Sequence, residues 1–217
     1  MPHAVPANPK IYHITHVDNL AGIASAGCLW SDRVRIDSEL ACSLVGMSKI
    51  KKRRLEEIEV DCHEGTKVGE YVPFYFCPRS IMLSIIYYNN HPELTYRGGQ
   101  NPIVHLRADL NAVIDWAETH EVRWACSDRN AGAHYVKFGR RRADLSMVNW
   151  NAVSNTIFRD PVVKEGKQAE FLLYESFPWH LIEAIGVRNE AILAKVRTAL
   201  RGTPHRPPVK VETSWYY

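Results

Sequence analysis

The sequence has no long apolar run and no targeting segment at its start. No stretch approaches the roughly 18 consecutive apolar residues that a membrane-spanning helix requires. The first residues, 1–6, lack the basic and apolar regions of a secretory signal peptide. These two absences favour a cytoplasmic protein that makes no association with a membrane.

Cysteine is present but lacks the spacing that would give it a structural role. The five cysteines are odd in number and widely separated, and no C-x-x-C pair occurs. Cys62 and His63 are adjacent, which is weak support for a metal site because a site needs further ligands at suitable spacing. The sequence therefore predicts reduced thiols, no disulfide framework and no bound metal.

The chain also lacks internal repeats, low-complexity tracts and a G-x-G-x-x-G fingerprint, so a Rossmann crevice is excluded. A length of 217 residues with 46% hydrophobic residues suits one domain, which we place at 1–217. Short strands mixed with segregated helices indicate the α+β class. Strands are predicted at 11–15, 71–76, 102–107, 122–126, 170–175, 182–187 and 209–215, and helices at 18–26, 79–88, 110–118 and 190–200.

Positive charge is modest overall but is gathered in places. The net charge is +3, whereas Lys49 to Arg54 and Arg140 to Arg142 form dense basic runs, with Arg129 nearby. Such runs are typical of polyanion binding, although the solvated face of a helix explains many of them. Apolar residues at helical spacing across 38–60 place the first run on a helix.

Glu170 is a single carboxylate at the start of an otherwise apolar strand, in the run Lys167 to Tyr174. An ionised side chain in such a place carries a desolvation cost, so it needs a partner or a function. A solvated glutamate that opens a strand is the alternative. The β-prone run Ile11 to Thr15 holds a histidine and a threonine on one side of its alternation and favours a function.

These segments resemble those of the DarT family, the DNA ADP-ribosyltransferase toxins of DarT–DarG toxin–antitoxin pairs. Each segment is weak alone, but their ordered combination is specific and covers nearly the whole chain. The segments that carry the resemblance are 11–20, 71–80, 98–100, 167–174, 177–179 and 215–217.

The resemblance implies a single α+β domain in which a split β-sheet cleft, flanked by helices, binds NAD as a substrate, with no metal. Transfer of ADP-ribose breaks the bond between nicotinamide and ribose C1′ through an oxocarbenium-like transition state. A carboxylate on the ribose hydroxyls stabilises that charge more in the transition state than in the ground state. The family pattern gives Glu170 this catalytic role and lets it accept a proton from the acceptor.

The family pattern also implies the residues that bind NAD. Segment 34–55 corresponds to an NAD-binding element and carries the second catalytic residue, an arginine. Arg54 is preferred over Arg53 for that position. A guanidinium stays protonated, so bidentate contact with the NAD diphosphate suits it better than proton removal. The expected NAD-binding residues are His13, Ile14, Thr15, Asn19, Gly22, Trp30, Arg53 and Arg54.

Segment 127–170 corresponds to the loop that presents the acceptor, which in this family is a base in single-stranded DNA, most often thymine. A base must leave its stack to reach a buried reactive carbon, so single strands suit the chemistry. Expected DNA contacts are Met82, Arg129 and Arg140. The expected partners are single-stranded DNA and a DarG-like macrodomain antitoxin, with the chain acting as a monomer. The alternatives are guanine in DNA, or an ADP-ribosyltransferase or 2′-phosphotransferase acting on RNA or protein.

Overall fold

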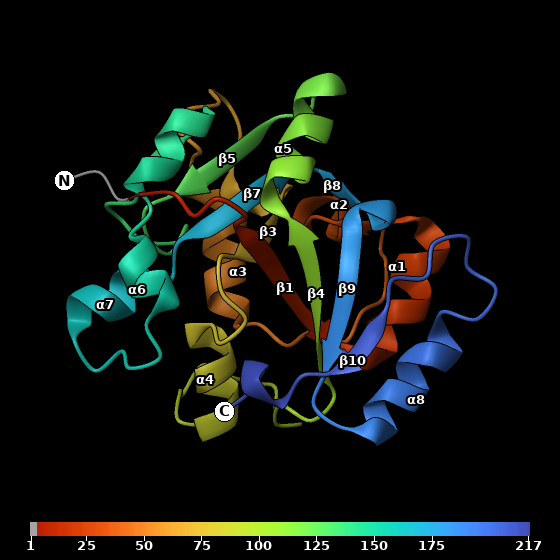
Figure 1. The fold of residues 1–217 in the computed structure, drawn as a ribbon. Helices are drawn as coiled ribbons and strands as arrows, with labels where there is room; N and C mark the ends of the chain where they lie inside the picture. The colour runs from red at the N-terminus through yellow and green to blue at the C-terminus, as the bar shows by residue number, and fades with distance from the viewer. Residues whose placement is uncertain (1–3) are drawn as a thin grey trace.

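One eight-stranded sheet runs through the molecule in the order β10-β9-β4-β1-β3-β7-β5-β6 (Figure 1). The computed structural model describes residues 4–217, so the first three residues of the expected domain lie outside the described range. Neighbouring strands are antiparallel except for β9 and β10, which are parallel. The strands of this sheet are β1 (Lys10–His16), β3 (Tyr71–Tyr75), β4 (Ile103–Asp109), β5 (Trp124–Ser127), β6 (Phe138–Gly139), β7 (Glu170–Tyr174), β9 (Ile182–Val187) and β10 (Val209–Val211).

The sheet divides between its two central strands. β1 pairs with β4 along its whole length, and β3 pairs with β7 along its whole length. The backbone register between β1 and β3 is a single pair, Tyr12 with Tyr75. The two halves therefore diverge on either side of this contact. This arrangement of a split sheet with flanking helices confirms the predicted α+β class.

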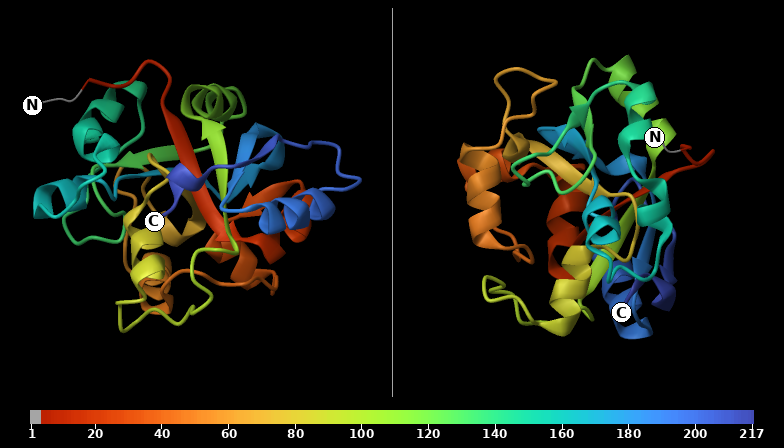
Figure 2. Two further views of the ribbon diagram at one scale, coloured as in Figure 1. Left: turned by 60° about the horizontal axis from the view of Figure 1, so that its bottom comes forward. Right: turned by 90° about the vertical axis from the view of Figure 1, so that its left-hand side faces the viewer.

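The helices begin and end where local sequence allows it. Ser80 caps α4, its Oγ accepting from the Leu83 N–H at 3.2 Å, and α1 ends at Gly27, whose φ of 71° is left-handed. Figures 1 and 2 show α1 and α8 beside β9 and β10, with α6 and α7 on the opposite side of the molecule. The helices are α1 (Leu20–Ala26), α2 (Asp32–Asp37), α3 (Ser48–Glu56), α4 (Ile81–Tyr88), α5 (Leu110–Thr119), α6 (Trp150–Ser154), α7 (Pro161–Gly166) and α8 (Glu190–Ala199).

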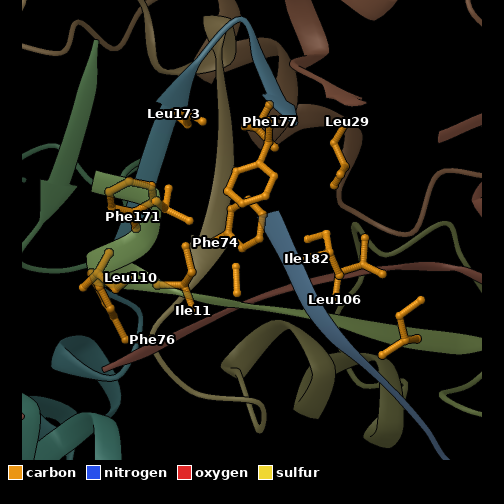
Figure 3. Close-up of a cluster of buried hydrophobic side chains, with 14 of the residues drawn as sticks. Ile11, Leu29, Phe74, Phe76, Leu106, Leu110, Phe171, Leu173, Phe177 and Ile182 are labelled. Carbon is orange, nitrogen blue, oxygen red and sulfur yellow. The ribbon is translucent and has the colours of Figure 1, made fainter. Parts of the chain in front are cut away.

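The largest core cluster contains side chains from both halves of the sheet (Figure 3). The Phe74 and Phe177 rings lie at its centre with centroids 4.3 Å apart. Phe177 belongs to β8 (Ser176–Pro178), which pairs with β2 (Cys28–Trp30) in a second, two-stranded sheet. The sequence does not predict this small sheet, because strands of three residues are too short to show an alternation of apolar and polar residues.

Segment 127–168 is more ordered than a loop. It contains β6, a 3₁₀ helix (Arg142–Met147), α6 and α7. Trp150 is buried, its ring packs 5.0 Å from that of Phe76, and its indole N–H donates to the Leu145 carbonyl at 2.9 Å. The short helices begin at side-chain caps, Asn149 and Asp160, and are too short to display a helical period.

The predicted strand 209–215 ends early. β10 stops at Val211, and a 3₁₀ helix (Thr213–Trp215) follows. The cause is the Trp215 ring, which lies against Gly186 so closely that a Cβ there would be 2.3 Å from it. The turn lets this ring cover β9, and the prediction of a strand through Trp215 was wrong.

Candidate active site

Glu170 opens β7 and is 1% exposed. Its Oε1 accepts from Arg54 Nη1 at 3.2 Å and from the Ala131 N–H at 3.0 Å, and its Oε2 accepts from Arg54 Nη2 at 2.8 Å. Its own peptide N–H donates to Ser127 Oγ at 2.9 Å. The solvated alternative is therefore excluded, because both carboxylate oxygens are buried and hydrogen-bonded.

Arg54 reaches Glu170 from α3, an element 116 residues away in sequence. Burial by itself would lower the Arg54 pKa, but the Glu170 carboxylate raises it above its ordinary value, so the guanidinium stays charged. Arg53 points elsewhere, with its Nε 3.7 Å from Glu57. Of the two candidate arginines, the structure brings Arg54 to the predicted catalytic glutamate. In the structure Arg54 donates to Glu170, whereas the prediction from the sequence was contact with the NAD diphosphate.

A cavity of about 670 Å³ opens in front of this pair, a volume within the range of ligand pockets. Residues 40–47 form one wall of it, and α3 and α4 contribute side chains. Arg54 lines the cavity but Glu170 does not, so the guanidinium lies between the carboxylate and the cavity. The residues predicted from the sequence that line it are His13, Ile14, Thr15, Asn19, Gly22, Trp30, Arg54 and Met82.

His13 is held in a defined protonation state. Its Nδ1 lies 2.8 Å from the Pro73 carbonyl, which can only accept, so Nδ1 carries the proton. Burial lowers the His13 pKa, and the ring is neutral at pH 7. Nε2 is therefore an acceptor, suited to a hydroxyl group. A Cβ on Gly22 would meet no atom within 4 Å, so this wall of the cavity is open for a ligand to approach.

Asn19 shapes the cavity through its neighbours. Its side-chain amide donates to Thr15 Oγ1 and to the Ser43 carbonyl, both at 3.0 Å, and accepts from the Ser43 N–H at 2.7 Å. Through these hydrogen bonds Asn19 links segment 40–47 to the end of β1. Asn19 lines the cavity, as predicted, and its amide already has partners in the wall.

Tyr75, Lys51, Asp32 and Gln168 are among the cavity residues not named individually from the sequence, although Lys51 lies within the predicted NAD-binding segment 34–55. Tyr75 pairs with Glu170 across β3 and β7, and burial raises its pKa well above the ordinary value. Lys51 and Asp32 form an ion pair of 2.7 Å. Gln168, which also lines the cavity, precedes Glu170 by two residues. Gln168 lies in the turn that follows α7, where no strand alternation marks it.

Arg129 and Arg140, the two arginines predicted to contact DNA, do not line the cavity. Arg129 pairs with Asp128 at 3.0 Å and with Glu165 at 2.7 Å. Arg140 donates its peptide N–H to Asp144. A role in DNA binding stays a prediction for both.

Two further observations concern the described residues 4–217. They contain no group of three or more histidine, cysteine, aspartate or glutamate side chains placed to hold a metal ion. In the same range, no helix is long and apolar enough to cross a membrane.

A split sheet with no G-x-G-x-x-G turn, and a buried glutamate beside a cavity at the split, define an ADP-ribosyltransferase. A family model described as "ssDNA thymidine ADP-ribosyltransferase, DarT" matches residues 12–217. A DNA ADP-ribosyl transferase of Thermus aquaticus is 38% identical over 99% of this chain and 91% of its own. The chain belongs to the DarT family and is an NAD-dependent DNA ADP-ribosyltransferase.

Solved structures agree with this assignment. Thermus sp. 2.9 DarT in complex with ADP-ribosylated ssDNA superposes with a TM-score of 0.88 at 34% identity, covering all of both chains. The same protein in complex with NAD+ gives a TM-score of 0.84 at 33% identity, covering 99% of this chain and 100% of that one. Thermosipho africanus DarTG in complex with ADP-ribose, at 17% identity, shares the fold with a TM-score of 0.75, over 96% of this chain and 51% of that one.

Proposed function

We propose that this chain transfers ADP-ribose from NAD to a thymine base in single-stranded DNA. The observation that carries the proposal is the Glu170–Arg54 pair, buried where the sheet divides and facing a cavity of about 670 Å³. The family match and the likeness to a DarT complex with ADP-ribosylated ssDNA support the choice of acceptor.

The cavity suits NAD in size and in chemistry. His13 Nε2 and Thr15 Oγ1 can hydrogen-bond ribose hydroxyls, and the open space at Gly22 admits a flat or bulky group. Lys51 and Arg35 also line the cavity and can balance the charge of the diphosphate. Trp30, 40% exposed at the cavity rim, offers a face for a ring of the dinucleotide.

Glu170 supplies the charge that the reaction needs. When the bond from ribose C1′ to nicotinamide breaks, its electron pair leaves with nicotinamide and positive charge develops on the ribose. A carboxylate bonded to a ribose hydroxyl stabilises that charge. For this bond to form, Arg54 releases one of its two bonds to Glu170 and the hydroxyl replaces it. Arg54 is thus a positioning residue that orients the buried carboxylate and pairs with its charge.

The acceptor must lose a proton as it attacks. The ring nitrogen of thymine that bears hydrogen forms the new bond to C1′, and Glu170 accepts that hydrogen as a proton. A single strand is the natural substrate because its base is already out of the duplex stack. Guanine in DNA and acceptors in RNA or protein would use the same NAD chemistry, so acceptor identity has to be tested directly.

The test is a comparison of acceptors at equal concentration with NAD. Single-stranded DNA, its duplex, RNA of the same sequence and a mixture of proteins are incubated with the enzyme and analysed by mass spectrometry. We expect the single-stranded DNA alone to gain ADP-ribose, and the gain to vanish when the target thymine is replaced. Glu170→Gln is the control, since it keeps the side chain's shape and some hydrogen bonds to Arg54. Modification of guanine, RNA or protein in preference to thymine would overturn the proposal.

We further propose that the chain acts as a monomeric toxin with a DarG-like macrodomain antitoxin. The pair Glu170 and Arg54 comes from a single chain, which supports activity without a second copy. Expression in bacteria should arrest growth and produce DNA adducts, and co-expression of a macrodomain that removes ADP-ribose from DNA should restore growth. Free growth with active enzyme and no adducts would contradict the toxin assignment.

A further inference from the structure

Four aromatic side chains form a continuous row across α4, the C-terminal residue and the segment after α6. The Tyr88 and Tyr87 ring centroids are 4.8 Å apart, Tyr87 lies 6.1 Å from Tyr217, and Tyr217 lies 6.1 Å from Phe158. We call these four residues the aromatic row. Figures 1 and 2 both show α4 beside the C-terminus, where the row begins.

The row is exposed at one end and rigid in the middle. Tyr87 is 46% exposed and Tyr88 is 61% exposed, which is unusual for large aromatic side chains on a helix. Tyr217 is fixed by its hydroxyl, which donates to the Arg79 carbonyl at 3.0 Å, and by its peptide N–H, which donates to Gln100 Oε1 at 3.0 Å. A fixed ring is a better stacking surface than a mobile one, because less rotamer freedom is lost on binding.

Three arginines without a carboxylate partner accompany the row. The Arg79 guanidinium lies 4.3 Å from the centre of the Tyr217 ring. Arg97 donates to the Asn89 side chain, next to Tyr88, and Arg159 follows Phe158 in the chain. Within residues 4–217, none of these three forms an ion pair, whereas three other arginines of segment 127–170 do so: Arg129, Arg141 and Arg142.

The row leads away from the active-site cavity. Ile81, Met82 and Ile85 of α4 line that cavity. Tyr88 follows Ile85 by three residues, so it continues the same side of the helix beyond the cavity. A DNA strand that runs along α4 from a target base in the cavity would therefore reach Tyr88 first.

We infer that the aromatic row is a stacking track for the nucleotides that flank the target base in single-stranded DNA. Successive bases stack on aromatic rings, and unpaired arginines meet the phosphates, which is how proteins hold single strands. Free positive charge beside exposed rings favours a nucleic acid over an apolar protein surface. This inference rests on the proposed function and adds where the strand runs.

The test measures affinity for single-stranded oligonucleotides of increasing length around one target thymine, by fluorescence anisotropy. The variants are Tyr87→Ala and Tyr88→Ala, with Tyr88→Phe as the matched control that keeps the ring. Each alanine variant should bind a long oligonucleotide about 5–140-fold more weakly, the range for one stacked base. The shortest oligonucleotide that the enzyme modifies should bind the alanine variants as tightly as it binds the wild type. Circular dichroism and NAD binding should be unchanged, since both rings are exposed.

A second arm removes bases instead of side chains. An abasic site at a flanking position that stacks on Tyr88 should weaken binding to the wild type but cause little further loss in Tyr88→Ala. Equal binding by Tyr88→Ala, Tyr87→Ala and the wild type at every length would overturn the inference. A further variant, Tyr135→Ala, removes a tyrosine that is 86% exposed outside the aromatic row. A loss confined to that variant would also overturn the inference, because the flanking bases would then stack on Tyr135. If the wild type modified no single-stranded DNA at all, the proposed function itself would fail.

Discussion

The basic runs at 49–54 and 140–142 hold their arginines in contrasting surroundings. The Arg54 side chain is 14% exposed and makes two bonds to a glutamate whose side chain is 2% exposed. Arg141 is 77% exposed in its pair with Asp144, and Arg142 is 41% exposed in its pairs with Asp115 and Glu118. Each of these three arginines pairs with a carboxylate at hydrogen-bonding distance, so charge and distance alone do not distinguish the pairs. Burial separates them, because water screens the exposed pairs and not the buried one.

The strongest way to break this comparison is Arg54→Ala. It would leave the buried Glu170 carboxyl without its cation and without two of its hydrogen-bond donors, so the free energy of unfolding should fall by about 3–5 kcal/mol. The transfer rate per molecule of folded enzyme should fall by roughly 10²–10³-fold. Urea unfolding followed by tryptophan fluorescence and a single-turnover transfer assay measure the two effects. A variant that lost neither would show that the pair has no role.

Arg54→Lys sharpens the comparison by keeping the charge. An ammonium group is a point donor and cannot reproduce two parallel bonds to Glu170, so one hydrogen bond to a charged group is lost. We expect the free energy of unfolding to fall by about 1.5–3 kcal/mol, less than for alanine. The same two assays apply. Equal losses for lysine and alanine would show that geometry, with no contribution from charge, governs the site.

Arg142→Ala tests the exposed run. Its ion pairs to Asp115 and Glu118 are half-exposed, so the free energy of unfolding should change by about 1 kcal/mol or less. The slope of log affinity for single-stranded DNA against log salt should stay the same, since its guanidinium is already paired. A slope smaller in magnitude by about 0.7 would instead show that Arg142 neutralises a phosphate.

The smallest expected effect is a pH dependence at Asp144. The hydrogen bond from Arg141 lowers the Asp144 pKa, so this carboxylate adds stability that is present above the ordinary aspartate pKa of about 3.9. That stability is lost as the pH falls through the folded-state value. Asp144→Asn should therefore be less stable than the wild type by about 0.5–1 kcal/mol at pH 7. Urea unfolding across pH 7 to 3 should show the gap closing below about pH 4, and a constant gap would contradict this origin.

Elements with a clear period could be predicted from the sequence, and they account for most of the sheet. β1, β3, β7 and β9 lie within a residue or two of their predicted ranges because their β-prone runs are bounded by turns and helix caps. α4 could be predicted because Ser80 starts it and an apolar face continues to Tyr88. β2 and β8 could not, because strands of three residues are specified by pairing across 148 positions, as at Leu29 with Phe177.

Several residues named from the sequence line one cavity, but the geometry that joins them was not predicted. His13, Arg54 and Glu170 were identified by resemblance, but the bond between Arg54 and Glu170 is a tertiary contact that no local pattern encodes. The contact of Trp150 with Phe76 is likewise tertiary, since the two residues are far apart in the sequence. Patterns along the chain report which side of an element faces inward, and say nothing of which inward side chains meet.

The span between the two partners also has a consequence during synthesis of the protein. Glu170 is made 116 residues after Arg54, and at about 5–20 residues per second the ribosome needs roughly 6–23 s to cover that distance. β7 must then insert between β3 and β5 before the carboxylate is buried. A nascent chain carries the nucleotide-binding half of the site without its carboxylate for all of that time. The order of the strands thus delays the appearance of activity until the chain is nearly finished.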